Sequence, residues 1–470
     1  MTAVPSPPTE ARGRSGERLA LVRDNVLALA RLALPMIVSR AGLAALGIAD
    51  AIMVSRYDPA QFALLSLADG TLGRVSDVFA AFVLGGLILV PRAFGAGDLR
   101  ACVRIWGRAM LPALGLGALA AALGLAGTPI FHVLGQSDAL AGGAGVVAAI
   151  LGVGKIAALP ALGAAVFLEG TRRPAIVAAS VVGANVLNVA LNAMLIGGFG
   201  AIPALGARGS ALSTTIVSFV LAGVLVGYAW KAVAVPARRT VARTSVPEHV
   251  QHRLGLSSAI VGGIMLSLTA SLTVFAGWLG PLALAVLAAA FALNAPVMLL
   301  ALGIGDATGI RVAEADGADA ASVPSGGNSI RPIVFASLLA VLGVSLAFVG
   351  LWSGFPRPLA TVFTHDPAMR GALAAVIPLA SVLLVLDGIC FVAVSALRAL
   401  HDIVWPTAIE IATMAALVPL AAYLAFDLAE GVRGLLVATL ATAAVRAVLL
   451  VQRLLLVTNA RTRARRAARA

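Results

Sequence analysis

Long apolar runs alternate with shorter polar connections along almost the whole chain. A helix needs about 20 mostly apolar residues to cross the hydrocarbon core of a bilayer, and the runs are at least this long. The pattern therefore predicts about twelve transmembrane helices. The runs lie near residues 26–54, 62–90, 103–126, 144–168, 175–197, 209–230, 254–279, 283–310, 331–352, 371–397, 405–426 and 432–457.

Basic residues gather in the connections that follow even-numbered runs. Arg92 follows the second run, Arg172 the fourth and Lys231 the sixth, and the chain ends in RTRARRAARA. Cytoplasmic connections of membrane proteins carry an excess of Lys and Arg, so this distribution predicts that both termini are cytoplasmic. The formal net charge of +13 then reflects membrane topology and does not indicate a nucleic-acid partner.

Composition supports this reading. The 470 residues are 60% hydrophobic and 12% charged, with a mean hydropathy of +1.00, whereas soluble domains carry about a quarter charged residues. We expect an all-α polytopic membrane protein in the cytoplasmic (inner) membrane. Two cysteines exclude a disulfide framework. No Walker-type phosphate loop or hydrolytic triad is present, so we expect no enzyme activity, cofactor or metal site.

A long, basic and proline-containing connection between the sixth and seventh runs divides the chain into halves. It suggests two lobes of six helices each, joined by a cytoplasmic linker. The predicted units are a disordered cytoplasmic tail (1–25), an N-terminal lobe (26–230), the linker (231–253), a C-terminal lobe (254–457) and a basic cytoplasmic tail (458–470).

The two halves resemble each other. The second run ends in VPRAFGAGDLRA (90–101) and the eighth in GIRVAEADGADA (309–320), each with an Arg before a turn of small and acidic residues. FLEGTRRPAIVAA (167–179) and ALRALHDIVWPTAIEIA (396–412) occupy equivalent joins. Repeats with an even number of spans share one membrane orientation, which predicts pseudo-symmetric lobes around a central cleft. This is a transporter architecture.

The first run carries one carboxylate, Asp50, and a proline, Pro35. Lipid does not solvate an ionised acid, so Asp50 must face other protein or a water-filled cavity. Burial disfavours the charged form, so Asp50 takes up a proton more readily than a fully solvated acid does. Pro35 lacks a backbone donor and gives the helix a place to bend. A helix that bends and carries a protonatable acid suits a proton-driven switch. The alternative is that Asp50 is a solvated helix end.

Several segments, in order along the chain, resemble the multidrug and toxic compound extrusion (MATE) family, in particular its NorM-type branch within the MOP flippase superfamily. They are LALPMIVSRAGLAALGIADAIMVSR at the first run, VPRAFGAGDLR (90–100), NVLNVALNAMLIGGFGAIPALGARGSALST (185–214) and DGICFVAVSALRALHDIVWPT (387–407). The resemblance implies export of organic cations and other amphipathic compounds in exchange for H⁺ or Na⁺.

The resemblance assigns a cation-coupling site. Asp50 matches the first-helix acid of the family and Pro35 its bend-forming proline. Asn188 and Asn192 match a polar pair that lies against this acid. Together with Asn185 they recur at i, i+3 and i+7, so they share one face of a helix. The alternative role for these amides is interhelical hydrogen bonding, worth roughly 1 kcal/mol each.

Asp387 matches the tenth-helix acid of the NorM-type branch, and we expect it to join the coupling site. A structural ion pair with Lys155, Arg446 or another buried base is the alternative. The branch also carries a seventh-helix Glu, where this chain has Met265. A thioether is a poor Na⁺ ligand, so this departure favours H⁺ over Na⁺ as the coupling ion.

The second run contains three charged residues, Asp69, Arg74 and Asp77. Arg74 and Asp77 are spaced i, i+3 and are expected to pair within the helix. Asp69 and Asp77, together with Asn185 and Met265, are candidates for lining a substrate cavity. Arg40 and Lys155 are further buried bases to which the sequence assigns no partner.

These observations predict a secondary active multidrug efflux transporter. It would export amphipathic, cationic compounds in exchange for H⁺ by alternating access, as a monomer in the lipid bilayer. The alternative is a lipid-linked oligosaccharide or polysaccharide flippase of the same superfamily, but such proteins use more spans or a strongly cationic cavity. A receptor or scaffold would not explain the repeated halves or the intramembrane acids.

Overall fold

The computed structural model describes residues 10–200, 203–237, 247–320, 330–363 and 366–469, and these ranges are almost entirely helical. Eleven helical segments among them are long and apolar enough to cross a membrane. The 31-residue helix α10 lies where the seventh span was predicted. The prediction of an all-α protein with about twelve spans is therefore confirmed.

The N-terminal half contains long spanning helices and short helices at their ends. Its elements are α1 (Glu10–Tyr57), α2 (Pro59–Leu87), α3 (Leu89–Gly95), α4 (Leu99–Leu125), α5 (Gly127–Val133), α6 (Asp138–Gly170), α7 (Pro174–Leu195), α8 (Ala207–Ala229), the π-helical turn η1 (Trp230–Ala234) and α9 (Val235–Ala237).

The C-terminal half repeats the succession of six long helices, with a short helix after the third, but its π-helical turn follows the fifth long helix and not the sixth. It comprises α10 (Glu248–Trp278), α11 (Pro281–Ala320), α12 (Ile330–Gly354), α13 (Pro356–Phe363), α14 (Pro367–Ala399), α15 (Val404–Ala422), the π-helical turn η2 (Tyr423–Asp427) and α16 (Gly431–Arg469).

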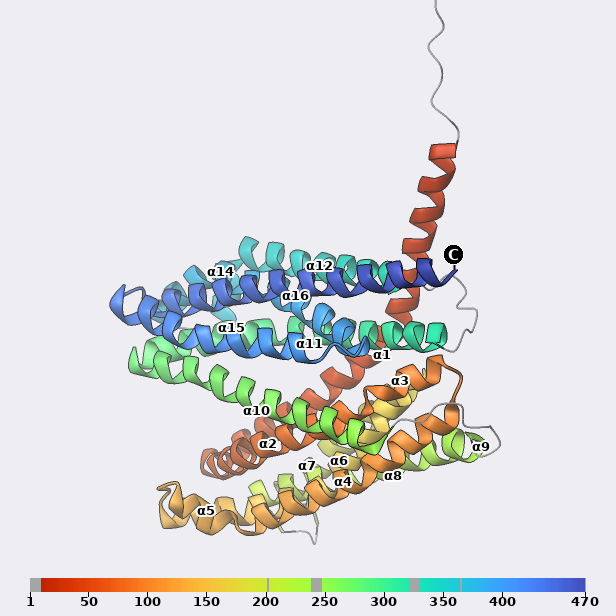
Figure 1. Cartoon of the computed structure of the whole chain (residues 1–470). Coiled ribbons are helices and arrows are strands. Elements are labelled where there is room, and N and C mark those ends of the chain that lie inside the picture. Colours follow the sequence, from red (N-terminus) through yellow and green to blue (C-terminus); the bar gives the residue numbers. More distant parts are fainter. Residues whose placement is uncertain (1–9, 201–202, 238–246, 321–329, 364–365, 470) are drawn as a thin grey trace, which may run out of the picture.

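The helices form two lobes that lie one above the other in Figure 1. The lower lobe contains α2 and α4 to α8, and the upper lobe contains α11, α12 and α14 to α16. Each lobe has its own buried apolar core. In the lower core Trp106 stacks on Phe167 with ring centroids 4.8 Å apart.

The first helix of each half crosses from one lobe to the other. Leu29 and Met36 of α1 are buried against α11, α12 and α14 of the upper lobe, but further along α1 packs on α7, where Gly42 meets Val181. Helix α10 makes the reverse crossing: its first turns pack on α2, and Leu272 belongs to the upper core. The predicted lobe boundaries assign each of these two helices to one lobe only. An apolar pattern shows that a helix is buried, but it does not show which helices it packs against.

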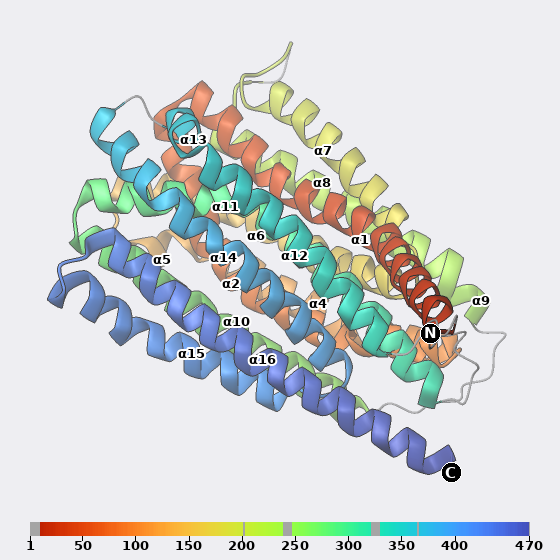
Figure 2. The ribbon, with the colours of Figure 1, turned by 90° about the horizontal axis from the view of Figure 1, so that it is seen from above.

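The lobes meet tightly at the end of the bundle where α1 begins and α16 ends, which we call the termini end (Figure 2). There α3 crosses the last turns of α11. A Cβ at Gly95 would collide with the backbone of Glu314, and one at Gly317 with the backbone of Arg92. Glycines at these two places let the backbones touch, and they come from the repeated segments VPRAFGAGDLRA and GIRVAEADGADA.

Ion pairs reinforce this contact between the lobes. Arg172, in the turn after α6, donates to both carboxylate oxygens of Glu314, with a shortest distance of 2.7 Å. These bonds raise the pKa of Arg172. Arg92 pairs with Asp316 at 3.3 Å. It also contacts His401, whose pKa burial and the Arg92 charge lower.

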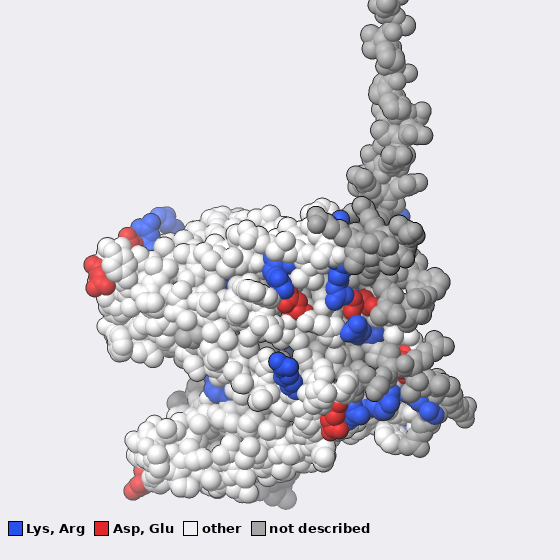
Figure 3. All heavy atoms as spheres, viewed as in Figure 1, with Lys and Arg blue, Asp and Glu red and all other residues white. Residues whose placement is uncertain are grey.

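Away from the termini end the lobes diverge, and a notch opens between them on the opposite side of the molecule (Figure 3). Most of the surface in this view is uncharged, as expected for a lipid-facing belt, and charged side chains gather toward the termini end. The predicted disordered tail (1–25) differs from the structure, because α1 is already helical from Glu10, and the basic C-terminal tail is helical as far as Arg469. Both segments are rich in Arg and Ala, which are strong helix formers.

Candidate functional site

Asp50 lies on α1 inside the lower lobe and is only 8% exposed. Its Oδ1 accepts hydrogen bonds from the side-chain amides of Asn188 (3.1 Å) and Asn192 (2.6 Å) on α7. Its Oδ2 accepts a hydrogen bond of 2.5 Å from the hydroxyl of Thr214 on α8. The structure thus brings together the three predicted polar residues, one on α1 and two on α7, and adds Thr214 from α8.

Further hydrogen bonds fix the two amides. Asn192 donates to the Oδ1 of Asn188 at 3.1 Å, and the Ser213 hydroxyl donates to the Asn188 backbone carbonyl at 3.2 Å. Both Asn side chains are fully buried. The donors that contact Asp50 are all neutral, so a negative charge on this carboxylate has hydrogen bonds but no counter-ion among the residues that bond it.

Thr214 was not among the predicted site residues. It follows Ser213 in the stretch SALSTT on α8. Several Ser and Thr residues lie together there, so the sequence does not distinguish a site residue from one that only packs against a neighbouring helix. Its place opposite Asp50 depends on how α8 packs beside α1 and α7. Sequence spacing within one helix does not contain that information.

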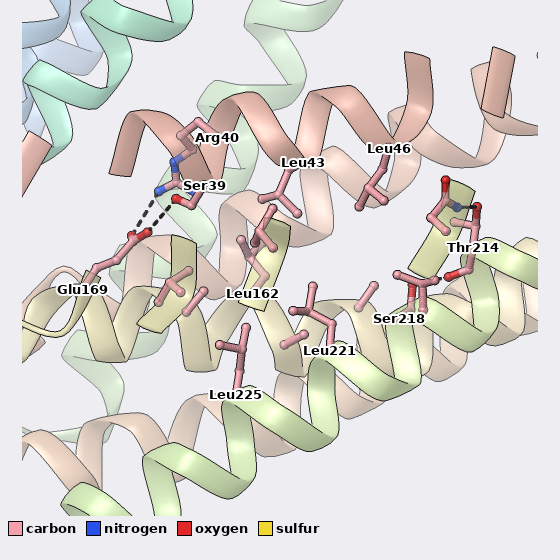
Figure 4. Close-up of a pocket in the computed structure, with 17 residues that line it drawn as sticks. Ser39, Arg40, Leu43, Leu46, Leu162, Glu169, Thr214, Ser218, Leu221 and Leu225 are labelled. Atoms are coloured by element: carbon pink, nitrogen blue, oxygen red, sulfur yellow. Dashed lines mark hydrogen bonds and ion pairs between the residues drawn. The ribbon is translucent and has the colours of Figure 1, made fainter. Parts of the chain in front are cut away.

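A cavity of about 110 Å³ begins at this polar site and runs through the lower lobe (Figure 4). Asn188 and Thr214 line one end of it, and Ser39, Arg40 and Glu169 line the other. Aliphatic side chains lie between the two ends, including Leu43, Leu46, Leu162, Leu221 and Leu225.

The second intramembrane acid, Asp387 on α14, has a different environment. Its Oδ1 lies 2.6 Å from the Nη2 of Arg446 on α16, and the Arg446 side chain is only 10% exposed. Arg446 also donates to the sulfur of Cys390 at 3.4 Å. Of the two roles considered for Asp387, the structural ion pair is therefore the one that these contacts favour.

Comparison with known proteins identifies a family whose model covers the segments that carry these residues. The sequence matches the MatE family model over residues 35–194 and 258–424, which include Asp50, both Asn residues and Asp387. The chain belongs to the MatE family. MatE proteins are membrane transporters, so this chain is a multi-pass transporter for small molecules and not an enzyme.

Individual members of the family cover nearly the whole chain. A protein of Caulobacter vibrioides named probable multidrug resistance protein NorM is 28% identical over 464 residues, covering 96% of this chain and 97% of that protein. The eukaryotic MATE transporter AtDTX14 has the same fold, with a TM-score of 0.80 at 19% identity over 93% of this chain and 96% of that one. An outward-facing MATE transporter of the MOP superfamily matches with a TM-score of 0.79 at 20% identity, covering 94% and 97% of the two chains.

The remaining predicted residues of this MatE protein lie apart from Asp50. Asn185 shares a helix face with the other two Asn residues but donates to the backbone carbonyls of Gly42 and Val181, both at 2.9 Å. It therefore joins α7 to α1, and it is not among the residues that line the two described cavities. Asn185 lies one turn from Asn188, at a point where α1 is close enough for its backbone carbonyl at Gly42 to accept a hydrogen bond from the Asn185 amide. Pro35 lies inside α1.

The acids of α2 are exposed and lie outside the residues that line the described cavities. Arg74 and Asp77 form no ion pair within 4 Å in the described part of the chain, contrary to the pairing expected within the helix. Both side chains are exposed, and Asp77 also interacts electrostatically with Lys155 of α6. Met265 lies on α10, but its side chain is outside the described part of the structure.

Proposed function

We propose that this MatE protein exports small amphipathic, cationic organic compounds in exchange for protons, by alternating access of a cleft between its two lobes. The printed names of its relatives, which are multidrug resistance proteins, support the substrate class. The observation that carries the proton coupling is the environment of Asp50, a buried carboxylate held by neutral donors alone.

The hydrogen bonds suggest how protonation would act. When Asp50 is ionised, two amides and one hydroxyl stabilise its charge. When it is protonated, it has a donor of its own, and Thr214 can rotate to accept from it, because a hydroxyl both donates and accepts. Thr214 and Asn188 also line the cavity, so this change reaches the cavity wall. Pro35 leaves one carbonyl of α1 without its helical donor, which lets α1 change its bend in response.

The same contacts favour H⁺ over Na⁺. A hard cation gives up its hydration shell only for several oxygen ligands at once. Both carboxylate oxygens of Asp50 are already directed at N–H and O–H groups, which present hydrogens and not lone pairs. A proton needs one lone pair, whereas Na⁺ would require these donors to turn away.

The second superfamily function, flipping of a lipid-linked oligosaccharide, receives less support. A diphosphate headgroup requires an excess of cationic side chains. The larger cavity between the lobes is lined by three acids, Glu169, Asp306 and Glu410, and by two arginines, Arg40 and Arg398.

Transport in everted membrane vesicles tests the coupling ion. With an acidic interior and no Na⁺, we expect vesicles that contain the protein to accumulate a cationic dye. With a Na⁺ gradient of roughly 100 mM, enough to fill weak sites of the extracellular type, and equal pH on both sides, we expect no accumulation. Accumulation driven by Na⁺ alone would contradict proton coupling.

We further propose that the termini end faces the cytoplasm in the inner membrane, and that the transporter acts as a monomer. A cysteine placed at position 240 in a chain without Cys102 and Cys390 should then react with an impermeant reagent only after the cells are opened. Labelling in intact cells would reverse the orientation.

A further inference from the structure

A second and larger cavity, of about 590 Å³, lies between the lobes. Helices of both halves contribute to its wall, and Met36, Leu87, Pro91 and Leu302 are among its apolar residues. The cavity is also lined by the five charged residues Arg40, Glu169, Asp306, Arg398 and Glu410. None of these five bonds Asp50, although Arg40 and Glu169 also line the far end of the smaller cavity.

Arg40 of α1 is shared between two of these acids. Its Nε and Nη2 lie 3.2 and 3.1 Å from the Oδ2 of Asp306 on α11. Its Nη2 also lies 3.4 Å from the Oε2 of Glu169 at the end of α6. By contrast, Arg398 pairs with Glu410 at 3.1 Å, so that pair is neutral as a unit.

One arginine does not neutralise two carboxylates, so the Arg40 group retains one negative charge when all three residues are ionised. The two acids differ in access. The Glu169 side chain is 2% exposed and also accepts a hydrogen bond from Ser39, whereas that of Asp306 is 36% exposed at the cavity wall. A cation that enters the cavity therefore meets Asp306 first.

Building on the proposed function, we propose that Asp306 recognises the cationic group of the exported compound, and that Arg40 occupies this place until the compound arrives. A guanidinium group can occupy the binding place of an organic cation, because both carry a single positive charge that is weakly hydrated. An incoming cation takes over Asp306, and Arg40 remains with Glu169. The uncompensated negative charge of the group is then neutralised, whereas an uncharged compound gains nothing from this exchange.

The exchange also changes the contact between α1 and α11. The Arg40–Asp306 pair joins these helices one turn from Gly303, where a Cβ would collide with Ile37 of α1. When the compound replaces Arg40 on Asp306, this pair is lost while the packing at Gly303 remains. Binding of a cation thus weakens the link between the helix that carries Asp50 and the upper lobe.

Equilibrium binding to the purified protein, without any gradient, tests the proposal independently of proton coupling. The probe is ethidium, a permanent monocation, followed by fluorescence anisotropy, with uncharged phenanthridine as competitor. We expect Asp306→Asn to weaken ethidium binding at least tenfold. Arg40→Gln should tighten it severalfold, because it removes the competing cation. Neither variant should change the affinity for phenanthridine by more than twofold.

The matched control is Glu430→Gln, which removes an acid that is paired with Arg433 outside the cavity, and ethidium should bind it as it binds the wild type. Even if Asp306→Asn fails to fold, the direction of the change in ethidium affinity in Arg40→Gln shows whether Arg40 competes with the bound cation. Weaker ethidium binding by Arg40→Gln would overturn the proposal, because Arg40 would then only position Asp306. Equal losses for ethidium and phenanthridine would overturn it as well, whereas failure of proton-driven transport in vesicles would leave these binding results unchanged.

Discussion

Two acids on membrane-spanning helices of this transporter, Asp50 and Asp387, illustrate opposite ways to keep a carboxylate inside a membrane protein. Asp50 is held by two amides and a hydroxyl, all neutral. Asp387 is held by the guanidinium of Arg446 at 2.6 Å. A proton on Asp50 removes an uncompensated charge, but a proton on Asp387 would leave Arg446 buried without its counter-ion. The comparison teaches that acids on spanning helices differ in their partners, and these contacts, not depth in the membrane, are the ground on which Asp50 is proposed as the coupling acid.

The sharpest test of this comparison is Asp50→Asn, which keeps the size of the side chain and removes titration. We expect proton-driven efflux of a cationic dye to fall to the background of cells without the protein, with unchanged protein levels. Asp24→Asn, an exposed position on the same helix, is the control and should transport normally. Wild-type efflux by Asp50→Asn would make Asp50 a passive helix residue.

The ion pair of the upper lobe can be tested through stability. Arg446→Met leaves Asp387 without its partner, and breaking a buried pair from one side costs about 3–5 kcal/mol. Because the Asp387 side chain is 33% exposed, we expect the lower end of this range. Thermal unfolding in detergent measures it.

The double variant Asp387→Leu with Arg446→Met should recover most of this loss, since no charge is left unpaired. Equal unfolding temperatures for the single and double variants would show that the pair is not what destabilises the single variant.

The amides around Asp50 predict a shift with pH. Asn192→Ala removes a donor that stabilises the carboxylate form, so the proton is released less readily and the pH profile of transport should move upward. A hydrogen bond to a charged group contributes about 1.5–3 kcal/mol, and about 1.4 kcal/mol corresponds to one pH unit, so we expect a shift of about one to two units. Asn188→Ala should shift it in the same direction.

Asn185→Ala is the matched control for this shift, because Asn185 lies on the same helix face but bonds the α1 backbone and not Asp50. It should leave the pH midpoint in place. Superimposable profiles for Asn192→Ala and the wild type would show that the amides do not tune the acid.

The smallest effect is expected for Asp387→Asn. Transport per folded protein should fall by less than about threefold, because replacing an ion-paired carboxylate removes no titrating group that the proposed cycle uses. Efflux from cells is normalised to the amount of folded protein. A loss as large as that of Asp50→Asn would place Asp387 in the coupling site together with Asp50.

The sequence alone determined the class of the protein. Apolar runs of membrane-spanning length, their interruption by basic connections and the repeated turns gave about twelve helices in two related halves. These features are local, because each run must satisfy its own backbone hydrogen bonds in lipid whatever its neighbours are. Asp50, Asn188 and Asn192 could also be selected from sequence, because charged and amide side chains are conspicuous inside apolar helices.

Only the tertiary structure decided which of these polar residues meet. Asn185 shares a helix face with Asn188 but bonds the backbone of α1, and Asp387 faces Arg446 rather than a neutral network. Arg40 had no partner in the sequence, yet it bridges Glu169 and Asp306 from different halves of the chain. A side chain's electrostatic environment is set within a few ångströms by whichever helix packs beside it. For Asn185 and Arg40 that choice follows from how α1 crosses between the lobes, which the periodicity of a single helix does not encode.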